Sequence, residues 1–298
     1  MSNKNKHGLS RDVPTAIKRK IRQMCGFGCV ICGSAIHTYE HIDPTFNEAT
    51  IHDPARMTLL CEQHQGLTTR GFLSKESIKK GTEHPKCLEK GFSFGPFDIG
   101  SDHPEVQVGS VTAKNVGVII RAMGDDILKI EPPEEPGGPF RLSALLSNRE
   151  GTEILRIEQN EWMAATSSWD VQTSGGRITI HNSPKDIGLV LKVDPPRSIS
   201  VEKLDMYHKG VRLKADDQVG LQVIAPSGVK FTTTGAEIEG GKAALVVTES
   251  GIVLGLRSRG TIIKQAAINS VTSWRSWRSK YVIPTWLVPL PEELHEGR

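Results

Sequence analysis

Two short cysteine-containing motifs near the N-terminus constrain this chain more than any other feature. Cys29 and Cys32 form a C-x-x-C unit, and Cys61 and His64 form a C-x-x-H unit later in the chain. Two residues between ligands let both side chains of a unit reach one ion from a tight turn, and two units supply the four ligands of a tetrahedral structural zinc. One C-x-x-C unit alone would also suit buried thiols or a redox pair. The second unit favours zinc.

The other cysteines leave one alternative open. All five cysteines lie in the first 90 residues, and the first residues lack the apolar core of a signal peptide. An odd number of cysteines without an export signal argues against a disulfide framework, so we expect a cytoplasmic protein. Cys25 competes with His64 for one ligand position, and we expect Cys87 to be free.

The chain is long enough for two domains, at about 150 residues per domain. Cysteines are confined to the N-terminal third, whereas all five tryptophans lie at or after Trp162. Gly, Pro and Asp cluster between residues 95 and 105, which favours a boundary there. We therefore expect a zinc-containing domain at 1–100 and a second domain at 101–298.

The second domain has the alternation of β-strands. Short runs such as "RITIHN", "GVRLKA" and "GLQVIA" alternate apolar and polar residues between Gly, Asn, Asp or Pro. This pattern predicts an all-β domain, either a sandwich or a β-solenoid, and an α+β chain as a whole. Its expected role is binding, sensing or formation of a homo-oligomer. The sequence shows no resemblance that identifies it.

The N-terminal domain has a different pattern. Residues 14–24 show helical spacing of apolar residues, "HTYEHI" and "MTLLC" suit short strands, and "CEQHQGLTT" can begin a helix. A further short helix is expected over residues 75–80. Glu40 and His41 lie in the first of these strands, between the two cysteine motifs.

Residues 15–75 resemble the HNH endonuclease family, whose fold is the ββα-metal motif. The matching segments are "CVIC", "EHIDP" and "RMTLLCEQHQ". The resemblance implies a hydrolase that cuts phosphodiester bonds in DNA. His41 would be the general base that takes a proton from water, and Glu40 would bind a catalytic Mg²⁺ or Mn²⁺. Cys29, Cys32, Cys61 and His64 would hold a structural zinc.

This sequence departs from the family pattern at two positions. Arg56 stands where the family has the Asn that orients the general base, and Gln65 stands where it has the last metal-binding His. Arg56 could instead clamp a phosphate, and Gln65 would be a weaker ligand of the catalytic cation. Two alternatives follow: His64 serves the catalytic ion while Cys25 completes the zinc site, or His52 and Asp53 substitute for the missing groups.

Charge adds a weaker indication of DNA as the partner. Residues 1–90 hold 14 Lys or Arg against 9 Asp or Glu, a net of +5, and subtraction from the totals of 37 and 34 leaves −2 for the rest. A basic region is typical of phosphate contacts, although inert surfaces also carry such an excess. The candidate phosphate contacts are Lys18, Arg19, Arg22, Lys75 and Lys79. No apolar run reaches the roughly eighteen residues of a membrane span, so no membrane partner is expected.

Two functions from different classes therefore remain. The first is an HNH-type DNA endonuclease with a β-rich accessory domain. The alternative is a catalytically inactive, zinc-stabilised module that binds nucleic acid or protein.

Overall fold

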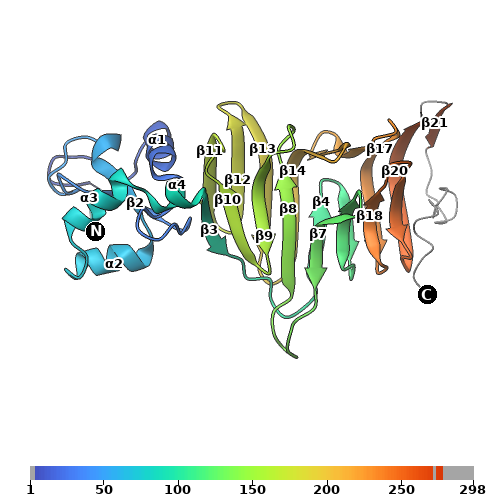
Figure 1. Ribbon diagram of the computed structural model, residues 1–298, viewed down its shortest axis with the longest axis horizontal. Coiled ribbons are helices and arrows are strands. Elements are labelled where there is room, and N and C mark those ends of the chain that lie inside the picture. The colour runs from blue at the N-terminus through green and yellow to red at the C-terminus, as the bar shows by residue number, and fades with distance from the viewer. Residues whose placement is uncertain (1–3, 271–272, 278–298) are drawn as a thin grey trace. The chain divides into compact units, whose positions relative to one another are not determined.

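The computed structural model describes residues 4–270 and 273–277, and most of its regular structure is β-strand (Figure 1). The chain divides into two compact units. The first contains the described residues up to Gly95 together with Trp162–Thr173 and Ile180–Lys185. The second contains Pro96–Glu161, Ser174–Thr179 and the described residues from Asp186 onward.

Within residues 4–270 and 273–277, all helices lie before residue 91. They are α1 (Thr15–Cys25), the 3-10 helix η1 (Pro54–Arg56), α2 (Glu62–Thr69), α3 (Lys75–Glu83) and α4 (Lys86–Lys90). No helix in the described ranges is long and apolar enough to cross a membrane.

The strands β1 and β2 lie among these helices, and the other described strands follow after residue 91. They are β1 (Thr38–His41), β2 (Met57–Leu60), β3 (Phe92–Pro96), β4 (Glu105–Val108), β5 (Val111–Lys114), β6 (Val118–Ala122), β7 (Asp125–Glu131), β8 (Arg141–Ser147), β9 (Glu153–Glu158), β10 (Glu161–Ala165), β11 (Asp170–Ser174), β12 (Arg177–Ser183), β13 (Asp186–Asp194), β14 (Ser198–His208), β15 (Val211–Asp216), β16 (Gly220–Ile224), β17 (Lys230–Glu239), β18 (Ala243–Val247), β19 (Ile252–Leu256), β20 (Gly260–Ser270) and β21 (Ser273–Trp277).

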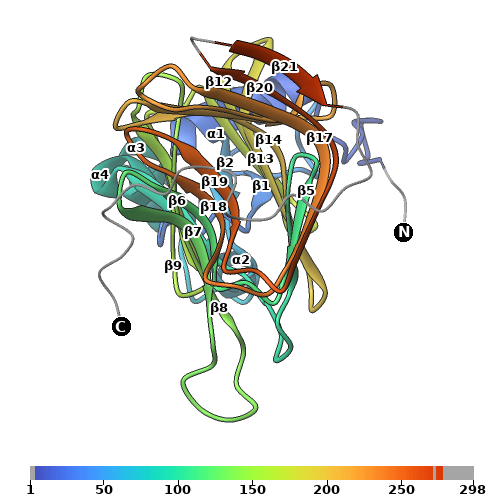
Figure 2. The ribbon, with the colours of Figure 1, turned by 90° about the vertical axis from the view of Figure 1, so that its right-hand side faces the viewer.

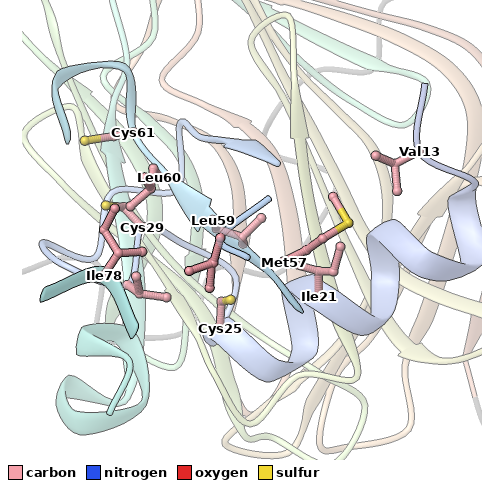
Figure 3. Close-up of a cluster of buried hydrophobic side chains, with 11 residues drawn as sticks. Val13, Ile21, Cys25, Cys29, Met57, Leu59, Leu60, Cys61 and Ile78 are labelled. Atoms are coloured by element: carbon pink, nitrogen blue, oxygen red, sulfur yellow. The ribbon is translucent and has the colours of Figure 1, made fainter. Parts of the chain in front are cut away.

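The core of the first unit is built around β2. The whole of this strand is buried, and it pairs antiparallel with β1 so that His41 lies opposite Met57. Figure 3 shows Met57, Leu59 and Leu60 among apolar side chains of α1 and α3, including Ile21 and Ile78. The predicted helix over 14–24, both predicted strands and the two later helices are confirmed, within one to three residues at their ends.

An ion pair inside the first unit joins α1 to the strand β11. Arg22 donates from Nε to Asp170 Oδ1 at 2.9 Å and from Nη2 to Asp170 Oδ2, and its Nη1 bonds the Tyr39 hydroxyl at 2.7 Å. Both charged side chains are almost fully buried, at 6% and 0% exposure. Burial works against the charge of Arg22, but the bonds to Asp170 and Tyr39 outweigh it and raise the pKa of the guanidinium. Arg22 was predicted to contact phosphate from an exposed helix face, and this placement is wrong, because its donors are already used inside the fold.

The sequence did not indicate that residues of the β-rich half belong to the first unit. Trp162 is 2% exposed, and a Cβ on Gly95 would approach its ring to 2.8 Å. The Thr173 hydroxyl bonds the Ala35 carbonyl at 2.9 Å, and Gln23 bonds the Trp169 carbonyl at 2.8 Å. The first unit is therefore completed by segments distant in sequence.

The second unit contains two sheets, which Figure 2 shows on opposite sides of the unit. One has the strand order β19-β18-β6-β7-β8-β9, and the other has β13-β14-β15-β16-β17-β20-β21 with β4 beside β14 and β5 beside β17. Neighbours in sequence pair antiparallel, whereas β4/β14, β5/β17 and β18/β6 pair parallel. A solenoid of parallel coils would give the opposite pattern, so the described strands favour two facing antiparallel sheets.

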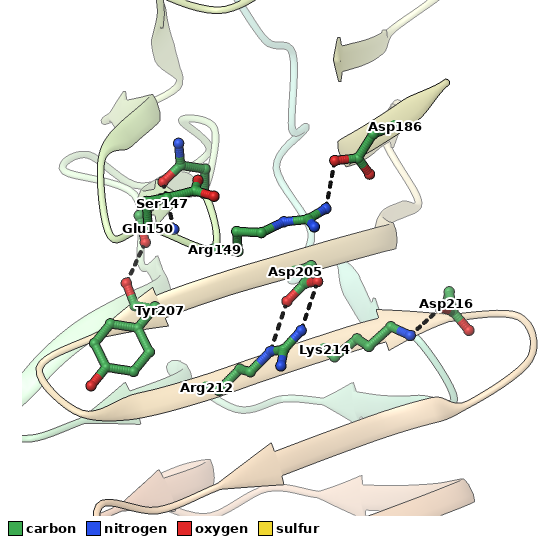
Figure 4. Close-up of polar contacts among 10 residues, drawn as sticks. Ser147, Arg149, Glu150, Asp186, Asp205, Tyr207, Arg212, Lys214 and Asp216 are labelled. Atoms are coloured by element: carbon green, nitrogen blue, oxygen red, sulfur yellow. Dashed lines mark hydrogen bonds and ion pairs between the residues drawn. The ribbon is translucent and has the colours of Figure 1, made fainter. Parts of the chain in front are cut away.

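Alternating burial explains how these sheets share a core. In β14 the buried residues are Ile199, Val201, Leu204 and Met206, and the change of step between Val201 and Leu204 coincides with a bulge opposite Val190 and Leu191. A bulge shifts which residues face inward, and therefore keeps Leu204 in the core. The other face of the same region carries polar pairs, shown in Figure 4, such as Arg212 with Asp205 at 3.1 Å.

The buried ion pair gives a stability prediction. Removing Asp170 leaves a charged guanidinium buried without its partner, which typically costs about 3–5 kcal/mol. We expect Asp170→Ala to lower the free energy of unfolding of the first unit by about this amount, measured by urea denaturation of the zinc-loaded chain.

Asp12→Ala is the matched control, because the pair between Asp12 and Lys18 is exposed. Exposed pairs contribute little, so this variant should unfold like the wild type. Equal unfolding midpoints for Asp170→Ala and the wild type would contradict the importance of the buried pair.

Candidate metal centre

Four side chains converge on one point of the first unit. The ligand atoms of Cys29, Cys32, Cys61 and His64 all lie within 4.8 Å of one another. The measured separations are 3.8 Å between the sulfurs of Cys32 and Cys61, 3.5 Å from Cys29 Sγ to His64 Nδ1 and 3.1 Å from Cys61 Sγ to the same nitrogen.

These separations suit a tetrahedral zinc. With Zn–S bonds of about 2.3 Å and Zn–N bonds of about 2.05 Å, tetrahedral geometry places two sulfurs about 3.8 Å apart and sulfur and nitrogen about 3.6 Å apart. Two of the three separations agree, and the pair of Cys61 and His64 is closer. The cluster is thus a Cys₃His group that can hold a zinc ion, as the two motifs predicted.

The first pair of ligands is positioned by a tight turn. The N–H of Gly33 bonds the Cys29 carbonyl at 2.8 Å, and the N–H of Cys29 bonds the Ser34 carbonyl at 2.8 Å. Gly33 has φ 95°, a conformation that strongly favours glycine. The N–H of Ser34 points at Cys32 Sγ at 3.5 Å, which stabilises negative charge on that sulfur.

The second pair of ligands is positioned by the start of a helix. Cys61 is the N-cap of α2 and makes no side-chain capping bond, so its sulfur faces the cluster. His64 follows in the first helical turn, and its Nδ1 faces the same point. The C-x-x-H spacing therefore works because the chain turns into a helix directly after the cysteine.

The first two ligand cysteines shift each other's pKa in opposite directions. A hydrogen bond from the Cys32 thiol lowers the pKa of Cys29 to about 4, against the opposing effect of burial, and the same bond raises the pKa of Cys32. Thiols bind a divalent metal as thiolates, so metal binding here releases protons.

The remaining two cysteines lie apart from the ligands. Cys25 ends α1, is 1% exposed and contacts the Thr58 hydroxyl at 3.8 Å, and burial raises its pKa to about 11. Cys87 is fully buried, its thiol faces the Gly33 carbonyl at 3.4 Å, and burial raises its pKa to about 12. The alternative in which Cys25 completes the zinc site is wrong, since the described cluster contains His64 instead.

A second polar group lies beside the cluster, in a small pocket of about 70 Å³. Gln65, the residue after His64, donates a hydrogen bond from Nε2 to Oε1 of Glu40 on β1. The Thr38 hydroxyl lies 3.3 Å from the same carboxylate oxygen and 3.4 Å from Gln65 Oε1. Burial raises the pKa of Glu40, while the bonds from Thr38 and Gln65 oppose that rise.

These oxygens suit a hard cation better than zinc. A carboxylate, a hydroxyl and an amide that can turn its oxygen inward are the ligand types of Mg²⁺ or Mn²⁺, which keep several waters. The structure therefore brings together the two side chains, Glu40 and Gln65, that the sequence singled out for such an ion. In its present orientation the Gln65 amide donates its N–H to the Glu40 carboxylate.

His41 lines the same pocket from the end of β1. Its Nε2 is buried and has no hydrogen-bond partner among the described residues, and its ring packs 5.6 Å from Phe46 and 5.2 Å from His52. Burial and the neighbouring His52 lower the pKa of His41, and a hydrogen bond with the Ile51 backbone opposes this. An unpartnered buried nitrogen costs about 1–3 kcal/mol, and such costs are concentrated at functional sites.

His52 and Asp53, the two residues expected as substitutes for the missing family groups, differ in their contacts. His52 lies beside His41, and its Nε2 bonds the Ser10 carbonyl at 2.9 Å. Asp53 caps η1 through Ala55 N and pairs with Arg56 at 3.7 Å. The Arg56 side chain is 61% exposed, while its carbonyl accepts the Ile42 N–H at 2.9 Å. Arg56 thus anchors the strand end through its backbone, and His52 is the group next to the candidate base.

The other predicted phosphate contacts are partly used within the fold. Lys18 pairs with Asp12 at 2.8 Å, Arg19 lies 4.9 Å from the Trp169 ring centre, and Lys79 pairs with Asp43 at 3.3 Å. Lys75 lines the pocket and has no ion-pair partner in the described part of the chain. Of the predicted cations, Lys75 is therefore the best placed to meet a ligand in the pocket.

Comparison with known proteins adds no relative. No protein-family model, no curated protein and no solved structure matches this chain. The interpretation of the site therefore depends on its own residues and geometry.

Metal removal tests the cluster directly. Structural zinc sites of this kind contribute folding free energy outright, by about 10–16 kcal/mol in small domains. We expect one zinc per purified chain by elemental analysis, and loss of both the zinc and the cooperative unfolding of the first unit in Cys61→Ala.

Cys25→Ala is the control, because this thiol is even more buried, at 1% exposure against 9% for Cys61, but is not in the cluster. It should keep one zinc per chain. A full zinc complement in Cys61→Ala, or its loss in Cys25→Ala, would contradict the assigned ligands.

Proposed function

We propose that this chain is a metal-dependent DNA endonuclease of the HNH type. The observation that carries the proposal is that Glu40, His41 and Gln65 line one pocket, and that Gln65 directly follows the cluster residue His64. These residues stand at the positions where the HNH motif has its cation ligands and general base. The order β1–β2–α2, with antiparallel strands followed by a helix, supports the same family.

The zinc and the chemistry have separate places in this proposal. The cluster fixes the start of α2, and Gln65 is the next residue after the ligand His64. A zinc bound by the cluster would thereby keep Gln65 against Glu40 on β1, and it would take no part in the reaction. A Mg²⁺ or Mn²⁺ held by Glu40 and Gln65 would stabilise negative charge on the scissile phosphate.

The protein residues then perform the proton transfer. His41 takes a proton from a water molecule, whose oxygen forms a bond to phosphorus while the bond to the leaving oxygen breaks. A lowered pKa keeps His41 neutral at neutral pH, as a base must be. The ring of His52 packs against His41 and restricts the orientation of this base, at a site that lacks the family's Asn.

One observation favours the non-catalytic alternative. Glu40 and Gln65 are hydrogen-bonded to each other, so neither side chain needs a second ion as a partner. This is the arrangement expected of a zinc-stabilised binding module. The two functions differ in whether DNA is cut and in whether a hard cation binds at Glu40.

Plasmid cleavage tests the first function. The wild type should nick supercoiled DNA with Mg²⁺ or Mn²⁺, and His41→Ala should lower the rate by about 10²–10⁴-fold because the proton acceptor is lost. The measurement is the initial nicking rate of zinc-loaded protein on an agarose gel.

His84→Ala is the control, since His84 ends α3 as an exposed C-cap. It should cut like the wild type. Equal rates for His41→Ala and the wild type would exclude His41 as the base, and no cleavage with either metal would favour the binding module.

The cation site has its own prediction. Imidazole is a better ligand for Mn²⁺ than a neutral amide, so Gln65→His should bind Mn²⁺ about tenfold more tightly. Calorimetric titration of zinc-loaded protein measures this affinity. Gln63→His, on an exposed position of the same helix, is the control and should not change it. An unchanged affinity in Gln65→His would mean that this position does not face a cation.

A further inference from the structure

The turn between α2 and α3 carries the most exposed large apolar side chain among the described residues. Phe72 is 80% exposed and belongs to no hydrophobic core cluster of the described residues. Single exposed apolar residues are common and need no explanation by themselves. Three further features of this turn distinguish it.

The first feature is that the turn is held rigidly with Phe72 outward. The N–H groups of Phe72 and Leu73 both bond the Leu67 carbonyl, at 2.9 and 3.2 Å. Gly71 has φ 78°, and its N–H bonds the Thr68 carbonyl at 3.1 Å. Leu73 packs on the core of the first unit. These bonds fix the backbone of the turn in a conformation that leaves the Phe72 side chain exposed.

The second feature is charge. Arg70 and Lys75, on either side of Phe72 in the sequence, are exposed and have no ion-pair partner within residues 4–270 and 273–277. By contrast, Lys79 and Lys80 on α3 pair with Asp43 and Glu76. The segment from 66 to 75 contains no acidic residue. An aromatic ring between two free cations is the pattern of proteins that stack on nucleobases and hold the adjoining phosphates.

The third feature is the position of the turn beside the pocket. Thr68 and Thr69 before Phe72, and Lys75 after it, line the pocket that contains Glu40 and His41. Phe72 therefore belongs to the same short segment that supplies these lining residues. Figure 1 shows this segment between α2 and α3.

We infer that Phe72 is a nucleic-acid contact that stacks its ring on an unstacked nucleobase, with Arg70 and Lys75 holding the flanking phosphates. The inference depends on DNA as the ligand of the proposed site, but not on cleavage. The base can come from a single strand or from a duplex step opened by the ring, since both present the same π-face.

Binding measurements without Mg²⁺ or Mn²⁺ test this inference. The full zinc-loaded chain is titrated into fluorescein-labelled oligonucleotides, one single-stranded and one duplex, and the Kd is read from fluorescence anisotropy. Phe72→Ala should weaken binding of at least one of them about tenfold, and Phe72→Trp should preserve it, because an indole also stacks. Phe72→Leu should behave like Phe72→Ala, since it keeps an apolar side chain but loses the ring.

The dependence on salt separates stacking from charge. Phe72→Ala should leave the slope of log Kd against log salt concentration unchanged, whereas Arg70→Ala should reduce it by about one. Leu88→Ala is the control, because Leu88 is a 48% exposed apolar residue on α4, away from the pocket lining. It should bind like the wild type. All variants should keep one zinc per chain and the wild-type melting temperature.

The comparison of the two oligonucleotides identifies whether the stacked nucleobase comes from a single strand or from a duplex. Loss confined to the duplex, together with new permanganate reactivity of thymines that depends on Phe72, supports a wedge between base pairs. Loss confined to the single strand supports stacking on an unpaired base. Wild-type affinity of Phe72→Ala or Phe72→Leu for both oligonucleotides would overturn the inference, and so would a failure of the wild type to bind either one at low salt.

These results stay distinct from those on the proposed function. A chain that binds DNA through Phe72 but never cuts it would retain this inference and lose the nuclease. If the wild type cuts DNA and Phe72→Ala binds both oligonucleotides with wild-type affinity, the nuclease is retained and this inference is lost.

Discussion

The Cys₃His cluster is the constraint on which the rest of the first unit depends. It joins a glycine turn to the start of α2, so a metal ion bound there fixes the direction of that helix. The groups on and after α2 follow from this direction: Gln65 meets Glu40, Thr68 and Thr69 line the pocket, and the turn after the helix presents Phe72. A core as small as that around β2 also gains stability from such a crosslink.

The second constraint is the buried pair of Arg22 and Asp170. It connects helix α1 to strand β11, which lies far along the chain. Arg22 also donates to the hydroxyl of Tyr39, a residue of β1. Strand β1 carries Glu40 and His41, so the pair supports the strand that bears the candidate chemistry. The pair favours this arrangement of α1 and β11, because a misdocked Arg22 would remain unpaired in an apolar environment.

The local features of the site could be predicted from the sequence, because each depends on neighbouring residues. The C-x-x-C and C-x-x-H spacings identified the four ligands, and helical and strand periodicity located α1, β1, β2 and α2. Long-range contacts could not be predicted. Nothing near Arg22 indicates a partner at position 170, and a basic helix face has the same sequence pattern whether it meets solvent or a buried carboxylate. Similarly, the proximity of His52 to His41 depends on how a loop folds back, which carries no periodic signal.

We propose that two different metal ions bind at neighbouring sites of this first unit. Crystals of the chain grown with Mn²⁺ would test this proposal by anomalous scattering measured at the zinc and manganese absorption edges. We expect a zinc peak among Cys29, Cys32, Cys61 and His64, and a separate manganese peak in the pocket bounded by Glu40 and Gln65. A zinc peak alone, with Gln65 still bonded to Glu40, would contradict the catalytic site and leave a zinc-stabilised binding module.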